Sequence, residues 1–130
     1  MREKPTVTEW WIKTWKNSEG QYHQDNDLPA IIQSNGYYEW CINGKLHRDN
    51  DLPARIWTDG GYQWWQNNEC HRDHDLPAVI GPDGSCSWYQ HSEKIKEKYC
   101  TQEEIEQYKK PYYQQKKLKI KFNRFEKLIK

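Results

Sequence analysis

Three copies of a His-x-Asp-x-Asp motif are the residues of this sequence best suited to chemistry. They recur every 24 residues, as His23, Asp25 and Asp27; His47, Asp49 and Asp51; and His71, Asp73 and Asp75. Imidazole and carboxylate groups together can bind a metal ion or carry out general acid–base catalysis. An active site is needed only once, so a motif in every unit favours a structural role in turns and connectors. A metal-dependent activity at these positions is the weakest of three functional hypotheses.

The four cysteines do not add a metal site. Cys41 and Cys70 occupy unrelated positions of the repeat, and Cys86 takes the place of a tyrosine. With Cys100 they form no pair at the close spacing of zinc ligands, so we expect buried thiols. The chain also contains no Gly-rich phosphate loop, nucleophile elbow or Cys–His pairing. The sequence therefore predicts no enzyme, no catalytic or metal-binding residue, no cofactor and no small-molecule substrate.

The motif is part of a longer repeated unit. An Asp-Leu-Pro-Ala stretch follows each histidine, and a glycine and a tryptophan then recur at the same period. The structural repeat motif consists of His23, Asp25, Asp27, Pro29, His47, Asp49, Asp51, Pro53, His71, Asp73, Asp75 and Pro77. Agreement at so many positions indicates a repeat protein with units near residues 15–40, 40–64 and 64–88.

Each unit has the pattern of two short strands. Ala-x-Ile follows the proline, an Asn-Gly or Asp-Gly dipeptide favours a hairpin turn, and Tyr38-Glu39-Trp40 alternates with period two. We therefore predict a mainly β fold, a repeat sheet of 24-residue β-hairpin units with a C-terminal α-helical cap. The predicted aromatic core ladder consists of Trp40, Trp64, Trp88, Tyr38 and Tyr62.

Aromatic residues dominate the apolar content of the chain. There are 8 Trp and 9 Tyr against 2 Phe, although only 35% of residues are hydrophobic. Such a composition can bury a thin layer of rings, and residues 10–15 predict an aromatic-rich entry strand. The tryptophans outside the repeating column form a candidate interaction surface: Trp10, Trp11, Trp57 and Trp65. We expect them to contact a protein partner or a second copy, as in a homodimer formed through the sheet or its ends.

The stretch from Asn43 to Ala54, with the sequence Asn-Gly-Lys-Leu-His-Arg-Asp-Asn-Asp-Leu-Pro-Ala, is followed by Asp59-Gly60 and Trp64. This unit resembles the variant MORN (membrane occupation and recognition nexus) repeats, and the resemblance covers roughly residues 15–95. Proteins with similar units are abundant in large DNA viruses and occur in some bacteria, so the resemblance implies a viral protein. It also implies an extended, twisted antiparallel meander, often dimeric, that is used for protein or lipid contact.

The C-terminal segment has a different pattern. We predict a repeat domain over residues 1–95 and a basic helical segment over residues 96–130. Thr101 and Glu104 form a capping box, which predicts the start of a helix that runs to about Lys109. Pro111 is expected to interrupt this helix. Apolar residues at helical spacing then predict an amphipathic helix: Leu118, Phe122, Phe125 and Ile129. Residues 118–122 would also suit a strand. The candidate basic-tail contacts are Lys116, Lys117, Lys121, Arg124 and Lys127.

Charge is segregated along the chain. Residues 109–130 carry nine Lys or Arg and only Glu126, a balance of +8, so at a net charge of +1 residues 1–108 carry −7. The basic segment can cap the acidic repeat domain, lie on an anionic membrane or contact nucleic acid, and these three uses stay open.

The leading functional hypothesis is a non-enzymatic repeat module for protein–protein interaction or scaffolding, with an unidentified protein partner. The alternative is a basic-tail adaptor that binds nucleic acid or an anionic membrane surface. The sequence shows no apolar leader and no run long enough to span a membrane. With unpaired cysteines, this predicts an intracellular, reducing compartment, which for a viral protein is the host cytoplasm or nucleus.

Overall fold

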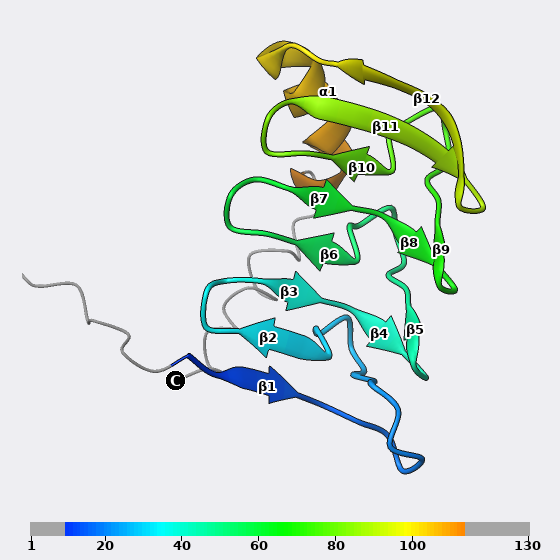
Figure 1. Ribbon diagram of the computed structural model, residues 1–130. Coiled ribbons are helices and arrows are strands. Elements are labelled where there is room, and N and C mark those ends of the chain that lie inside the picture. Colours follow the sequence, from blue (N-terminus) through cyan, green and yellow to red (C-terminus); the bar gives the residue numbers. More distant parts are fainter. Residues whose placement is uncertain (1–9, 114–130) are drawn as a thin grey trace, which may run out of the picture.

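The computed structural model describes residues 10–113, and the side chains of residues 10–110. Within that range the fold is mainly β with one C-terminal helix, as the sequence predicted. Eight strands form one antiparallel sheet whose spatial order follows chain order, β1-β2-β3-β6-β7-β10-β11-β12 (Figure 1). The predicted meander is therefore confirmed.

The strands are short, and β2, β6 and β10 begin 24 residues apart. The main sheet contains β1 (Ile12–Thr14), β2 (Ile31–Gln33), β3 (Tyr38–Glu39), β6 (Arg55–Ile56), β7 (Tyr62–Gln63), β10 (Val79–Ile80), β11 (Ser85–Gln90) and β12 (Glu93–Tyr99). Two side hairpins lie beside it: β4 (Cys41–Ile42) with β5 (Lys45–Leu46), and β8 (Trp65–Gln66) with β9 (Glu69–Cys70) (Figure 1). A unit thus contains a main-sheet hairpin and, in the second and third units, a separate side hairpin.

Residues with positive φ form the turns. The three repeated glycines of the main-sheet hairpins have φ between 90° and 100°, a region that favours glycine. Gly36 meets a second constraint, because a Cβ atom there would lie 2.0 Å from Cγ2 of Thr58 in the next hairpin. The side hairpins turn at Asn43-Gly44 and Asn67-Asn68, where both residues have positive φ, as type I′ turns require.

Strand register gives the sheet two different faces. On the inner face, one row of Cα partners crosses six strands: Ile32, Tyr38, Ile56, Tyr62, Ile80 and Cys86. On the outer face, the neighbouring row consists of Ile31, Glu39, Arg55, Gln63, Val79 and Ser87. We call these the inner row and the outer row. Because side chains alternate along a strand, a shift by one residue would exchange the two rows.

The aromatic core lies on the inner face. Trp40, Trp64 and Trp88 are only 2%, 2% and 5% exposed and pack with inner-row residues. Tyr38 and Tyr62 are half-buried, with ring centroids 6.2 Å and 6.3 Å from Trp40 and Trp64. The structure thus places all five residues of the predicted aromatic ladder on one face. Rings fill this core because the chain has few aliphatic side chains to do so.

The last strand runs past the boundary that the sequence predicted. β12 pairs with β11 from Glu93 to Tyr99, so the sheet continues across the predicted division between residues 95 and 96. The repeat pattern ends at Ile95, which stands where the next motif histidine would fall. Strand pairing needs only backbone groups, so the sheet can extend after the side-chain pattern has ended.

The helix α1 (Gln102–Tyr113) covers the inner face at the C-terminal end of the stack (Figure 1). It opens with the predicted capping box. The N–H of Glu104 donates to Thr101 Oγ1 at 3.2 Å, and the N–H of Thr101 donates to Glu104 Oε1 at 2.9 Å. The helix passes Pro111 instead of ending near Lys109, because a proline removes one backbone donor without always stopping a helix.

The four free cysteines should differ in reactivity. Cys41, Cys70 and Cys86 are buried, and burial raises their pKa to about 12, 11 and 12, whereas Cys100 is half-buried. A raised pKa leaves little reactive thiolate near neutral pH. We expect iodoacetamide to label Cys100 at least ~10-fold faster than the other three until urea unfolds the protein, as measured by peptide mass spectrometry. Equal labelling rates for Cys70 and Cys100 would contradict the buried side hairpin.

Candidate functional site

Three connectors hold the residues that are best suited to chemistry. They comprise residues 23–29, 47–53 and 71–77, each running from the motif histidine to the proline that precedes β2, β6 or β10. In every connector two consecutive residues have positive φ: Asn26 and Asp27, Asn50 and Asp51, and His74 and Asp75. Two such residues in succession form a type I′ turn, and Asn and Asp adopt this conformation more readily than most residues.

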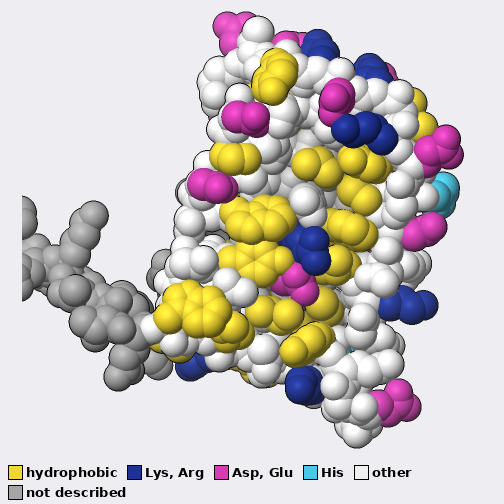
Figure 2. Space-filling model, in the orientation of Figure 1, with side chains coloured by type: hydrophobic (Ala, Val, Ile, Leu, Met, Phe, Trp, Pro, Cys, Tyr) yellow, Lys and Arg dark blue, Asp and Glu magenta, His cyan; other side chains and the backbone are white. Residues whose placement is uncertain are grey.

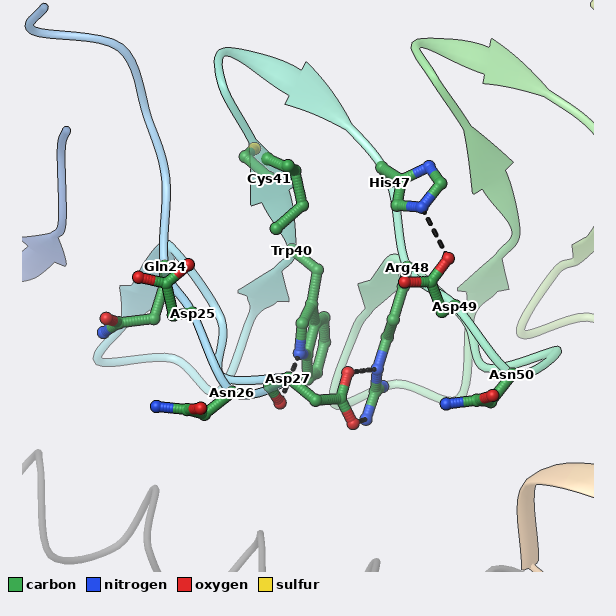
Figure 3. Close-up of a pocket in the computed structure, with 11 residues that line it drawn as sticks. Gln24, Asp25, Asn26, Asp27, Trp40, Cys41, His47, Arg48, Asp49 and Asn50 are labelled. Atoms are coloured by element: carbon green, nitrogen blue, oxygen red, sulfur yellow. Dashed lines mark hydrogen bonds and ion pairs between the residues drawn. The ribbon is translucent and has the colours of Figure 1, made fainter.

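An arginine of the second connector binds the turn aspartate of the first. Nε of Arg48 donates to Oδ1 of Asp27 at 2.8 Å and Nη2 to Oδ2 at 3.2 Å, a bidentate pair. Nη1 donates to the carbonyl of Pro53 at 3.1 Å, and the guanidinium lies 3.8 Å from the ring centroid of Trp40. The indole N–H of Trp40 donates to the Asp27 carbonyl at 3.1 Å. Figure 3 shows these side chains converging between neighbouring connectors.

The same arrangement recurs one unit later. Arg72 binds Asp51 at 2.8 and 3.2 Å, donates to the carbonyl of Pro77 at 3.2 Å and lies 3.9 Å from the ring centroid of Trp64. Both arginines are 2% exposed. Burial lowers the pKa of Arg72, while the hydrogen bond and charge of Asp51 raise it. A guanidinium remains protonated in proteins, so each pair is ionic.

The motif histidines join their own connector to the next turn along the stack. Nδ1 of His47 accepts the backbone N–H of Asn67 at 3.1 Å, and Nε2 lies 2.7 Å from Oδ1 of Asp49. His23 and His71 make the equivalent pairs of contacts. Because Nδ1 accepts a hydrogen bond, Nε2 carries the proton and donates to the aspartate, which sets the tautomer.

These contacts engage the groups that catalysis or metal binding would need. The hollows between successive connectors measure about 190 and 210 Å³ and are lined by equivalent side chains of the repeat. Among residues 10–110, no three His, Cys, Asp or Glu side chains gather in a way that could hold a metal ion. The geometry supports the interpretation of the connectors as repeated structural links.

The tryptophans of the candidate interaction surface lie in different settings. Trp10 is 63% exposed beside β1, and Trp11 is half-buried. Trp57 is half-buried, with its ring centroid 5.2 Å from that of Tyr37. Trp65 donates its indole N–H to an outer-row glutamine at 2.9 Å and packs against all three core clusters. Trp65 therefore contributes mainly to packing, and Trp10 is the member with the most exposed ring.

Figure 2 shows the outer face, where apolar side chains form a stretch that a basic and an acidic side chain interrupt near its middle. Nε of Arg55 donates to Oε1 of Glu39 at 3.0 Å across two adjacent strands of the outer row. The hydroxyl of Tyr37 also donates to Glu39, and burial, aided by this carboxylate, raises the pKa of Tyr37. A hollow of about 240 Å³ adjoins this region and is lined in part by Trp57, Gly61, Val79, Gly81 and Pro82.

Arg48 and Arg72 are the main site residues that the sequence prediction missed. Both follow a motif histidine directly and recur at the 24-residue period, so the periodicity could have identified them. The predicted basic-tail contacts lie outside the described residues: Lys116, Lys117, Lys121, Arg124 and Lys127.

Comparison with known proteins gives no relative for this chain. No family model, no curated protein and no solved structure matches it. The resemblance to MORN repeats therefore remains a prediction. In the part of the chain that the structure describes, no helix has the length and apolar character needed to cross a membrane.

Replacing Arg72 by Ala tests the link between units. The change removes the cation that faces Asp51 and uncovers the ring of Trp64, so we expect the free energy of unfolding to fall by roughly 3–5 kcal/mol. Arg72→Lys keeps the charge but loses the bidentate geometry, and it should restore only part of this loss. Urea unfolding followed by tryptophan fluorescence measures both variants. Lys45→Ala, at an exposed position of β5, is the control, and an equal loss in Arg72→Ala and the control would disprove the link.

Proposed function

We propose that this chain is a non-enzymatic scaffold for protein–protein interaction, in which the outer face of the sheet binds the partner. In this proposal the connectors only hold the units together. The three motif histidines and five of the six motif aspartates already have partners within the repeat, as the contacts of His47 and Arg72 illustrate.

The observation that carries the proposal is that residue types repeat at the inner positions of the sheet but not at the outer positions. The inner positions hold Ile32, Ile56 and Ile80 in one set, and Trp40, Trp64 and Trp88 in another. Outer positions do not repeat: Trp57 corresponds to Gln33 and Gly81, and Arg55 corresponds to two aliphatic residues. Core packing requires the inner side chains to be alike, whereas an outer face without that requirement can be specific for one partner.

The outer side chains give this face a defined chemistry. Trp57 and Tyr37 form an aromatic pair, and the glycines beside them leave a hollow of about 240 Å³. The ion pair of Glu39 and Arg55 lies in the outer row. An aromatic or large aliphatic side chain of a partner protein fits such a hollow, with polar groups of the partner near the ion pair. Apolar anchors with charged neighbours are typical of protein interfaces.

Trp57→Gln should weaken partner binding while the sheet stays folded. Loss of a tryptophan from the centre of an interface commonly costs about 2 kcal/mol or more, which is about 30-fold in affinity. A nuclease-treated pull-down from cell lysate with the full chain identifies the bound protein. Titration with that purified partner then measures the affinity of each variant.

Tyr22→Ser is the matched control, because it removes a ring that is 41% exposed and lies near Lys16, away from Trp57. Circular dichroism checks that both variants are folded. Equal affinities of Trp57→Gln and the unchanged chain would contradict binding through the outer face. Retention of nucleic acid without any protein would instead favour the basic-tail adaptor.

We further propose that the module self-associates along β1. Among the described strands β1 pairs only with β2. Ile12 of β1 is 45% exposed, and Trp10, two residues before it, is 63% exposed. The opposite edge strand is protected by charge, with Glu93, Lys94, Lys96, Glu97 and Lys98 in β12. Charged edges resist strand addition, whereas apolar edges accept it. A second copy that pairs β1 with β1 would continue the sheet in antiparallel fashion.

Ile12→Lys should convert a dimer into a monomer. A lysine on an edge strand opposes the pairing of another strand. Size-exclusion chromatography with light scattering should give twice the chain mass of 15.9 kDa for the unchanged protein and the single mass for Ile12→Lys. Ile95→Lys makes the same change on the other edge strand and should remain dimeric. A monomeric unchanged protein, or dissociation by both variants alike, would exclude the β1 edge.

A further inference from the structure

The helix α1 occupies one end of an apolar strip on the inner face. Ile105 is buried with Ile80 and Cys86 of the inner row. On one side, Nη2 of Arg72, in the third connector, donates a hydrogen bond to the carbonyl of Tyr108 at 2.8 Å. On the other side, helix and hairpin-turn residues together line a hollow of about 360 Å³. The helix thus packs on the inner row, and this apolar strip is flanked by the connectors on one side and the hairpin turns on the other.

Successive residues of α1 contact units that lie progressively closer to the first unit. Ile105 packs in the third unit, and the ring of Tyr108 meets Trp88 edge-on at a centroid distance of 5.7 Å. One residue further, Nζ of Lys109 lies 5.2 Å from the ring centroid of Tyr62, which belongs to the second unit. Figure 1 shows the helix descending behind β11 and β10 in this direction. The C-terminal part of α1 therefore lies over the second unit, and the helix runs in the direction of the first.

The inner face of the second and first units has the same types of residue as the part that α1 covers. Tyr38 occupies the position of Tyr62 one unit earlier, and Ile56 and Ile32 continue the inner row. The connectors along the border are acidic. Together they carry six aspartates against two arginines: Asp25, Asp27, Asp49, Asp51, Asp73 and Asp75 against Arg48 and Arg72. A ligand that continues along this strip therefore needs an apolar side and basic side chains.

Residues 114–130 of the same chain have both properties, an apolar side and basic side chains. This segment carries seven Lys or Arg and only Glu126, a formal charge of +6. Its apolar residues recur at helical spacing, as Leu118, Phe122, Phe125 and Ile129. Seventeen residues span about 25 Å as a helix. The three strand spacings from β7 to β2 amount to about 14 Å, so the segment is long enough.

We propose that residues 114–130 bind in cis along the inner row of the second and first units. Their apolar side chains contact the strip that contains Tyr38 and Ile56, and their lysines face the aspartates of the first two connectors. The attraction is electrostatic as well as apolar, because the segment and the connectors carry opposite net charges. The tail is then a cap that extends α1 over the whole stack. Its lysines are engaged within the chain, and the outer face stays available for the partner.

Zero-length crosslinking tests this placement on the full chain. A carbodiimide joins an amine to a carboxylate only when the two are in contact. In an equal mixture of ¹⁴N- and ¹⁵N-labelled protein, we expect crosslinks from Lys116, Lys117 or Lys121 to connector aspartates within single-isotope chains. Lys98 and Glu104, 2.6 Å apart, provide the internal positive control. Formation of the control crosslink without any tail-to-connector crosslink would overturn the proposal, as would crosslinks that join only chains of different isotopes.

A pair of variants separates apolar docking from charge attraction alone. Phe122→Asp and Asn123→Asp change the charge of the tail equally, but only the first removes a side chain of the apolar set. We expect Phe122→Asp to lower the yield of the tail crosslinks at least ~10-fold while Asn123→Asp retains most of it. Equal yields in the two variants would show that the tail does not bind through this apolar side.

Discussion

The contact of a buried arginine with the turn aspartate of the preceding connector is the interaction on which the stack depends. Arg48 meets three chain segments at once: the carboxylate of Asp27, the ring of Trp40 and the carbonyl of Pro53. Burying a guanidinium is costly unless its charge and its donors are satisfied. Here they are, and no buried side-chain nitrogen or oxygen in the described residues lacks a hydrogen-bond partner. The arginine therefore links its own connector to the turn of the preceding one.

The ends of the stack show what replaces this link. At the C-terminal end Lys96 stands at the arginine position, with Nζ 4.4 Å from the ring centroid of Trp88. An ammonium group cannot make the planar bidentate contact, and α1 adds the ring of Tyr108 over the same tryptophan. At the other end Gln24 and Lys16 occupy the positions of the arginine and the tryptophan, so the link begins only at the second connector. Atypical end units of this kind are expected where a stack meets solvent.

Local residue patterns were sufficient to predict the hairpin repeats, their turns and the capping box, because each depends on residue types close together in the chain. The partner of Asp27 could not be predicted in this way, since Arg48 lies 21 residues further on and only the stacking of units brings the two together. The side hairpins contain strands of two residues, too short to show an alternating pattern. Trp57 and Trp65 looked alike in sequence, and only the structure shows that Trp57 pairs with Tyr37, whereas Trp65 packs against three core clusters.

Under the proposed function, this repeat sheet separates stability from recognition. The contacts that hold the units together use the same residue types in the second and third connectors, so they cannot distinguish these units from one another. The outer face has no such constraint, and one position there holds Gln33, Trp57 and Gly81 in successive units. A substitution at that position alters the surface without breaking an arginine–aspartate link, whereas a change in a connector would disturb two units together. The proposed partner binding therefore suits the outer face, where three different residues at one repeat position give three different local surfaces.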